Sequence, residues 1–277
     1  MMGTLEGKAV LVLIVLALLC TSAFGQTTTN EWTIKGNVLV TLGKYDEAIQ
    51  AFDKAIEINP QNADAWTNKG ESLRRQGKYD EAIQAFDKAI EINPQNADTW
   101  YDKGIALKAR GKYDEAILAY DKAIEINPQD ADAWTSKGIA LYYQDKYNES
   151  IQAFDKAIEI NPQDADTWYD KGNVLETQGN HKIQGKYDEA ILAYERAIQI
   201  DPQYAEAWTN KGNVLYYQSK YNESIQAFDK AIEINPKLAL PLYNKGEALK
   251  ALGRTTEADA AYAKANDLGF TGLIPVP

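Results

Sequence analysis

Residues 63–96 read ADAWTNKGESLRRQGKYDEAIQAFDKAIEINPQN, and closely similar stretches recur along the chain. Six Asn-Pro or Asp-Pro pairs mark the period, with prolines 34, 34, 34, 40 and 34 residues apart. A fixed period of this length indicates a repeat array in which each repeat contacts its neighbours. The sequence predicts seven repeats, at 29–62, 63–96, 97–130, 131–164, 165–204, 205–238 and 239–270.

Each repeat carries two helical patterns. In the second repeat, Trp66, Gly70 and Leu73 are spaced to share one face of a first helix. Gly77 stands where that helix should end, because glycine readily adopts the left-handed conformation of a helix C-terminus. Because Gly70 is small, we expect it to let the helices of the repeat approach closely.

The second helix shows the same spacing. Ala82, Phe86 and Ala89 lie four and three residues apart. Pro94 ends the helix, since proline lacks an amide hydrogen and disfavours a helical residue before it. Asn96 then offers a side-chain cap for the next first helix.

This set of positions resembles the tetratricopeptide repeat family. The resemblance rests on Trp66, Gly70, Leu73, Tyr79, Ala82, Phe86, Ala89 and Pro94. It covers residues 29–270 and implies an all-α fold, a right-handed α-solenoid of seven helix–turn–helix units. It is specific for the fold and much less specific for the function. Together with the N-terminal segment described next, it suggests an exported repeat protein of prokaryotic type.

The N-terminal segment has the pattern of an export signal. Eleven apolar residues, Ala9–Leu19, follow Lys8 and are too few to span a bilayer comfortably. We expect a signal peptide at 1–25, cleaved after Gly25, then a linker at 26–28 and a secreted, cell-surface or envelope location. The alternative is an uncleaved membrane anchor at residues 9–20. A lipoprotein signal at Cys20 is disfavoured, because Leu19 is not small.

Two departures break the regularity. The fifth repeat has six extra residues, and 178–185 read like a duplicated Gln-Gly turn that contains the single histidine, His181. This turn is either a protrusion that binds a partner or contacts a metal, or a loop insertion that the fold tolerates. The last repeat has Leu242 in place of the tryptophan, as expected for a terminal repeat. The apolar tail, 271–277, either packs over the last helix or serves as an attachment point.

Composition argues against several classes of function. The chain has 40 acidic and 29 basic residues, a net charge of −11, and lacks the basic face that nucleic acid requires. One histidine and one cysteine leave few nucleophile–base pairs. Glycine motifs of nucleotide sites and calcium loops are not present. We therefore expect the chain not to be an enzyme and to bind neither a cofactor nor a metal.

Asn148 and Asn222 match the glycosylation sequon, although sequence drift among the repeats explains these two asparagines equally well.

The resemblance implies that first helices line a concave groove, at positions 2, 5, 6, 9, 12 and 13 of each repeat. Asparagines recur there in pairs, at position 9 of one repeat and position 6 of the next. An amide can bond a peptide backbone through its donors and its acceptor; alternatively, these are tolerated polar helix residues. The candidate ligand-binding asparagines are Asn37, Asn68, Asn173, Asn210, Asn213 and Asn244.

Two tyrosine pairs complete the candidate site, Tyr142 with Tyr143 and Tyr216 with Tyr217. Tyrosines are common anchors in interfaces and also stack on sugar rings. We expect at least one of each pair to pack against the neighbouring repeat.

The groove charge is wrong for a carboxylate clamp of the kind found in chaperone-binding family members. Cationic residues would be needed where the chain has Thr33, Asp98, Asp102, Tyr169, Leu240 and Asn244. Acidic residues also occupy position 2 of five repeats, where they either favour a basic ligand or complement the helix dipole. They are Asp64, Asp98, Asp132, Asp166 and Glu206.

The preferred function is a non-catalytic scaffold that holds a peptide or protein segment in its groove outside the cytoplasm. The alternatives are an envelope glycan binder that uses the tyrosine pairs and an accessory subunit of an envelope complex. A membrane contact is expected only through an uncleaved N-terminal anchor, and the oligomeric state is left open. The paired asparagines favour a binding site in the C-terminal half.

Overall fold

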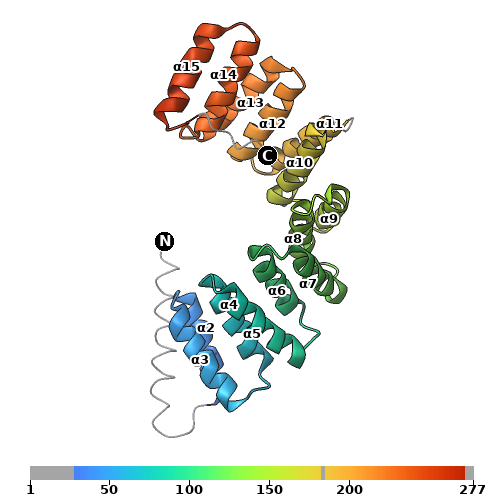
Figure 1. The fold of residues 1–277 in the computed structure, drawn as a ribbon, viewed down its shortest axis with the longest axis vertical. Coiled ribbons are helices and arrows are strands. Elements are labelled where there is room, and N and C mark those ends of the chain that lie inside the picture. Colours follow the sequence, from blue (N-terminus) through green and yellow to red (C-terminus); the bar gives the residue numbers. More distant parts are fainter. Residues whose placement is uncertain (1–27, 182–184, 272–277) are drawn as a thin grey trace. The chain divides into compact units, whose positions relative to one another are not determined.

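The computed structural model describes residues 28–181 and 185–271, and these residues are α-helical without any strand (Figure 1). Fourteen helices in this part of the chain form seven consecutive helix–turn–helix repeats, which confirms the predicted fold class. They are α2 (Thr29–Thr41), α3 (Tyr45–Ile58), α4 (Ala63–Arg75), α5 (Tyr79–Ile92), α6 (Ala97–Ala109), α7 (Tyr113–Ile126), α8 (Ala131–Tyr142), α9 (Tyr147–Ile160), α10 (Ala165–Asn180), α11 (Lys186–Ile200), α12 (Ala205–Tyr217), α13 (Tyr221–Ile234), α14 (Ala239–Ala251) and α15 (Thr255–Asp267).

The predicted signal or anchor at 1–25, linker residues 26 and 27, and tail residues 272–277 lie outside the described residues. Within 28–181 and 185–271, none of the helices has the length and apolar character needed to cross a membrane.

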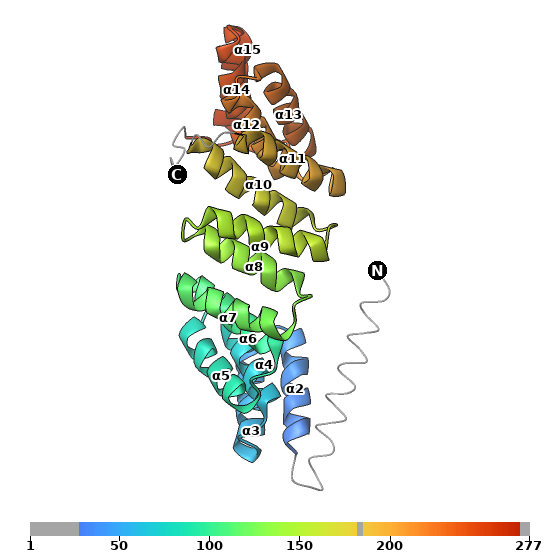
Figure 2. The same cartoon turned by 90° about the vertical axis from the view of Figure 1, so that its right-hand side faces the viewer.

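The chain divides into two compact units, Met1–Ala140 and Leu141–Pro277. In the first, α2 packs with α3, α4 with α5, and α6 with α7; in the second, α10 pairs with α11, α12 with α13, and α14 with α15 (Figure 2). Helices α3, α5, α11 and α13 also contact the first helix that follows them, α4, α6, α12 and α14 respectively. Below, these parts are called the N-terminal unit and the C-terminal unit.

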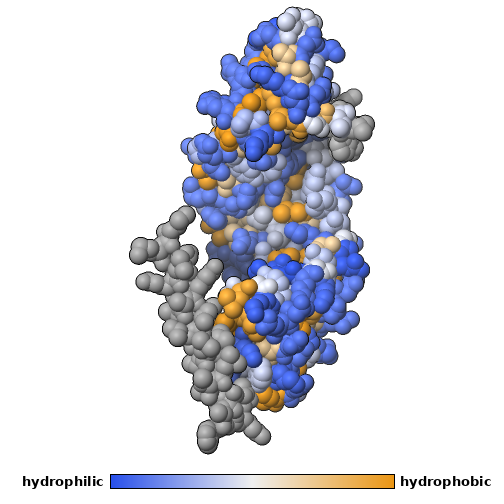
Figure 3. Space-filling model, turned by 90° about the vertical axis from the view of Figure 1, so that its left-hand side faces the viewer, coloured by the Kyte–Doolittle hydropathy of each residue, from blue (hydrophilic) through white to orange (hydrophobic). Residues whose placement is uncertain are grey.

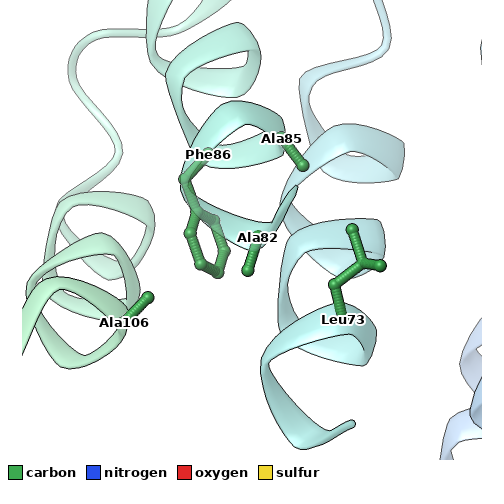
Figure 4. Packing of buried hydrophobic residues seen from close by; sticks show 5 residues of the cluster. All are labelled: Leu73, Ala82, Ala85, Phe86 and Ala106. Carbon is green, nitrogen blue, oxygen red and sulfur yellow. The ribbon is translucent and has the colours of Figure 1, made fainter. Parts of the chain in front are cut away.

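The core of a repeat centres on an aromatic side chain that packs among small residues. Phe86 is fully buried, and its ring points from α5 toward Ala106 of α6, beside Ala82 (Figure 4). A Cβ added to Gly70 would lie 2.7 Å from this ring, closer than real Cβ contacts. The expectation that small residues permit close helix approach is therefore confirmed at Gly70.

The helix ends follow local chemistry. Gly77 has φ +75° and its amide donates to the Arg74 carbonyl at 2.9 Å, which closes the turn after α4. The second helix α5 ends at Ile92, before Pro94, and Asn96 accepts a hydrogen bond from the Thr99 amide at 3.2 Å. The stop and cap signals of this repeat are confirmed.

The same turn lacks glycine in two repeats. Asp145 and Ser219 have φ of 58° and 61°, a conformation that costs L-residues about 1 kcal/mol or more. We expect Ser219→Gly to raise the free energy of unfolding by about 0.5–1 kcal/mol, as measured by urea denaturation. Gly77→Ala, at the equivalent turn, should lower it. A destabilised Ser219→Gly variant would show that the turn carries no strain.

A repeated set of contacts joins neighbouring repeats. Lys103 forms an ion pair of 2.6 Å with Asp87 of the preceding repeat and lies 5.3 Å from the centroid of the Trp100 ring. The Trp100 indole donates to the carbonyl of Pro94 at 3.0 Å. The same ion pair recurs at Lys69, Lys103, Lys137, Lys171, Lys211 and Lys245. These lysines belong to the scaffold and do not balance charge on the first-helix face.

The insertion in the fifth repeat differs from the expected turn. Helix α10 continues through Gln178 and Gly179 to Asn180, and both Gln178 and Gly179 are buried. A Cβ on Gly179 would lie 2.4 Å from the Tyr187 ring, so this glycine permits packing instead of ending the helix. The Gln178 amide donates to Asn148 Oδ1 at 2.9 Å. The prediction of a loop from Gln178 onward was wrong for this additional helical turn.

Candidate functional site

The predicted asparagines meet in pairs across adjacent first helices. Asn68 Nδ2 on α4 donates to Asn37 Oδ1 on α2 at 3.0 Å. In the C-terminal unit, Asn210 Nδ2 donates to Asn173 Oδ1 at 2.9 Å, and Asn244 Nδ2 donates to Asn213 Oδ1 at 2.8 Å. All three bonds join position 9 of one repeat to position 6 of the next, as the spacing suggested.

The Asn173–Asn210 pair is part of a wider cluster of amide and hydroxyl groups. Both amide hydrogens of Asn210 are used, one toward Asn173 and one toward the Tyr169 hydroxyl at 3.1 Å. Asn173 also interacts with the Tyr169 hydroxyl, so both amides belong to one polar cluster. A side-chain amide carries N–H donors and a carbonyl acceptor, which are the complements of a peptide bond's C=O and N–H.

A buried tyrosine supports this pair from the second helix. The Tyr194 hydroxyl lies 2.9 Å from Asn173 Oδ1 and 2.7 Å from Glu176 Oε2. Burial raises the pKa of Glu176 to about 7, although the bond from Tyr194 opposes that rise. The pKa of the Tyr194 hydroxyl is raised well above its usual value by burial. The contact with this buried hydroxyl orients the Asn173 amide.

Tyr204 departs from the local pattern. It occupies the N-cap of α12 and makes no side-chain cap bond, whereas Asn62 and Asn96 cap the equivalent helices. Losing such a cap costs about 1 kcal/mol. Instead, its ring packs 4.9 Å from the Tyr169 ring at an interplanar angle of 33°, and its hydroxyl donates to Asp166 Oδ1 at 2.8 Å. Such a departure from the usual capping residue is typical of functional surfaces.

Sequence reasoning did not single out Tyr204 as a site residue. The signal that could have found it is the tyrosine at a position where four other repeats have the capping residues Asn62, Asn96, Asp130 and Asp164.

The tyrosine pairs divide into packed and exposed members. The Tyr142 hydroxyl lies 3.4 Å from the Thr177 hydroxyl of the next repeat, and Tyr216 packs against the core that contains Leu249. Tyr143 and Tyr217 are 58% and 52% exposed. The expectation that one member of each pair packs against a neighbour is confirmed.

A second tyrosine pattern distinguishes alternate repeats. Where the core ring is tyrosine, position 5 is also tyrosine, and the rings touch, as for Tyr101 with Tyr120 at 5.9 Å and Tyr243 with Tyr262 at 5.4 Å. Where the core ring is phenylalanine, as at Phe86, position 5 is threonine, as at Thr67. The first-helix face therefore changes from one repeat to the next.

The N-terminal unit presents a different arrangement at one of these junctions. Glu71 and Asp102 stand where other junctions have paired asparagines, and Glu71 binds Arg74 Nη2 at 2.8 Å and Arg75 Nε at 2.6 Å. Burial and the Glu71 charge raise the pKa of Asp102 to about 6. This junction is an ion cluster and presents no free amide pair.

The remaining candidate features belong to the repeat scaffold or to the exposed surface. Among residues 28–181 and 185–271, no group of three or more His, Cys, Asp or Glu side chains is arranged to hold a metal ion. His181 packs edge-on against Tyr147, with ring centroids 5.7 Å apart. A groove of about 980 Å³ is lined by residues of α11, α12 and α13 and includes Leu192, which is 62% exposed. The face in Figure 3 is mostly hydrophilic, with small separate apolar patches.

Family models match most of the repeat array. Models described as tetratricopeptide repeat match residues 35–97, 73–138, 205–238 and 227–260, and a TPR repeat model matches 138–179 and 181–219. The chain is a tetratricopeptide repeat protein. None of the curated proteins matches it.

Solved structures of tetratricopeptide repeat proteins are similar. YrrB, described as a TPR protein with an unusual peptide-binding site, is 26% identical, with a TM-score of 0.59 over 71% of this chain and 98% of its own. MamA is 30% identical, with a TM-score of 0.56 over 61% of this chain and 95% of its own. A tetratricopeptide repeat protein from Parabacteroides merdae has 21% identity and a TM-score of 0.66 over 89% and 95% of the two chains, and it shows the fold alone.

Proposed function

We propose that this tetratricopeptide repeat protein is a non-catalytic scaffold that holds an extended segment of a partner protein along its first helices. The observation that carries the proposal is the hydrogen-bonded asparagine pair that recurs between adjacent first helices, because amide side chains can both donate to and accept from a peptide backbone. YrrB, whose description names a peptide-binding site, supports the same class of ligand. The expected location outside the cytoplasm rests on the export signal predicted at residues 1–25.

The spacing of the pairs suits an extended chain. Packed helices lie about 8–10 Å apart, and an extended chain rises about 3.3 Å per residue. Successive pairs in the C-terminal unit, Asn173 with Asn210 and Asn213 with Asn244, would therefore contact every third residue of a ligand. Both pairs include a residue of α12, so this helix lies at the centre of the proposed site.

Binding of library-selected peptides tests the proposal. We expect Asn210→Ala to weaken peptides selected from a random 15-residue library about tenfold, because the hydrogen bond of Asn210 to the peptide and the bond that orients Asn173 are both lost. Fluorescence anisotropy with residues 26–277 measures the affinity. The matched control is Leu192→Gln on the second-helix side, where Gln226 occupies the equivalent position, and it should change nothing. Selected peptides that bind Asn210→Ala as tightly as the parent would contradict the proposal.

A second candidate, glycan binding, is favoured by the exposed rings of Tyr143 and Tyr217. Tyr217 also stacks on Tyr187 at 5.9 Å and 22°, which makes a flat aromatic surface. If the library yields no peptide while the protein is retained on envelope polysaccharide, and Tyr217→Ala abolishes that retention, glycan binding replaces peptide binding.

A further inference from the structure

The first-helix face of the C-terminal unit is strongly acidic. Its groove positions in repeats five to seven hold one cation, Lys250. They hold five carboxyl groups, Asp166, Asp170, Glu176, Glu206 and Glu247. Glu176, whose pKa burial raises to about 7, carries only part of a negative charge at neutral pH, so the other four supply most of the charge. The same positions of repeats one to three hold four carboxylates, Asp64, Glu71, Asp98 and Asp102, against three cations, Arg74, Arg75 and Lys108. The excess of negative charge is therefore a property of the C-terminal unit and not of the repeat in general.

Nearby lysines do not offset this charge. Lys171, Lys211 and Lys245 are engaged in ion pairs of 2.5–2.8 Å with acidic residues of the preceding second helices. At Asp166 and Glu247, the hydrogen bonds come from neutral hydroxyls, those of Tyr204 and of Tyr262, the latter at 2.7 Å. A hydroxyl orients a carboxylate without cancelling its charge, so the surface keeps its attraction for cations.

Aromatic rings border these carboxylates. Tyr204 packs on Tyr169 beside Asp166, and Tyr243 packs 4.4 Å from Phe270 on the repeat that carries Glu247. The faces of aromatic rings attract cations, and a carboxylate beside the ring adds to that attraction. Together with the amide groups of the asparagine pairs, these features describe a surface for a peptide backbone and basic side chains.

We propose that the occupant of this face is an extended peptide segment rich in lysine or arginine, with basic side chains at about every third residue. This inference rests on the proposed function and names its class of partner. The amide pairs hold the backbone of the segment. A basic side chain lies against the Tyr204 ring, between Asp166 and Glu206, which stand at position 2 of adjacent repeats. The spacing of basic residues follows from the spacing of first helices.

Three matched peptides test the charge preference. Each has 12 residues with Gly-Ser between the variable positions, and every third residue is Lys, Gln or Glu. We expect the Lys peptide to bind residues 26–277 at least tenfold more tightly than the Gln peptide, and the Glu peptide to bind most weakly. Added salt should reduce the advantage of the Lys peptide, because screening weakens exposed charge pairs.

Two double variants locate the effect. Asp166→Asn with Glu206→Gln should weaken the Lys peptide about tenfold and leave the Gln peptide unchanged. Asp64→Asn with Asp98→Asn removes the same charge from equivalent positions of the N-terminal unit and should leave both affinities unchanged. Equal affinity for Lys and Gln peptides, no detectable binding of the Lys peptide, or an equal loss in the N-terminal double variant overturns the inference. If Asn210→Ala still weakens library-selected peptides, the proposed function stands although this inference falls.

Discussion

We expect Gly70→Ala and Phe86→Ala each to destabilise the chain, and the double variant to be more stable than the sum of the two losses predicts. The Phe86 side chain is fully buried, and removing such a ring costs about 3–5 kcal/mol. The added methyl group of Gly70→Ala would lie 2.7 Å from the ring, an overpacking that costs about 1–3 kcal/mol. When the ring is absent, the methyl group instead fills part of the cavity, so the two changes compensate.

Urea denaturation of the four proteins, followed by circular dichroism, measures the coupling. We expect about 1–3 kcal/mol of compensation, since the two groups are in direct contact. Gln84→Ala, on the exposed side of α5, is the matched control and should add independently to Gly70→Ala. Strict additivity of Gly70→Ala and Phe86→Ala would show that the helices separate to admit the methyl group.

The scaffold was predictable because its determinants are local. Gly77, Pro94 and Asn96 act within a few residues, through backbone conformation and capping. Their recurrence at a fixed period made the assignment of seven helix–turn–helix repeats secure. The same local rule failed in the fifth repeat, where Gly179 looked like a stop signal. There the nearby Tyr187 ring needs a residue without a Cβ, so packing between helices decides the role of this glycine.

The binding face was predictable in part. Spacing alone paired Asn173 with Asn210, but it could not show that Tyr194, 21 residues from Asn173, fixes the pair from the second helix. Likewise, Tyr204 reaches Asp166, 38 residues earlier in the chain. Contacts of this kind depend on side-chain direction across repeats, which periodicity does not encode. The signal peptide, the tail and the location of the protein remain predictions from the sequence.

The stability of the C-terminal unit should fall as the pH rises from 5 to 8. The pKa of Glu176 is raised to about 7 in the folded chain, against a usual value near 4.5. Between these two values the folded state binds more protons than the unfolded state, so stability decreases with rising pH. The stabilisation is complete below pH 4.5 and is lost as the pH passes through 7. The shift corresponds to about 3 kcal/mol, because one pKa unit is worth about 1.4 kcal/mol.

Glu176→Gln isolates the contribution of the Glu176 carboxyl to this pH dependence. The glutamine oxygen still accepts a hydrogen bond from Tyr194, but the side chain cannot ionise. We expect the variant to lose most of the decline in urea midpoint between pH 5 and pH 8. Asp102, whose pKa is raised to about 6 in the N-terminal unit, contributes a smaller decline of the same sign that Asp102→Asn should remove. Glu206→Gln, at an exposed position of the same face as Glu176, is the control and should keep the parent's decline. If Glu176→Gln retains the full decline, the Glu176 carboxyl is already ionised in the folded chain at neutral pH, and its burial is less complete than the structure indicates.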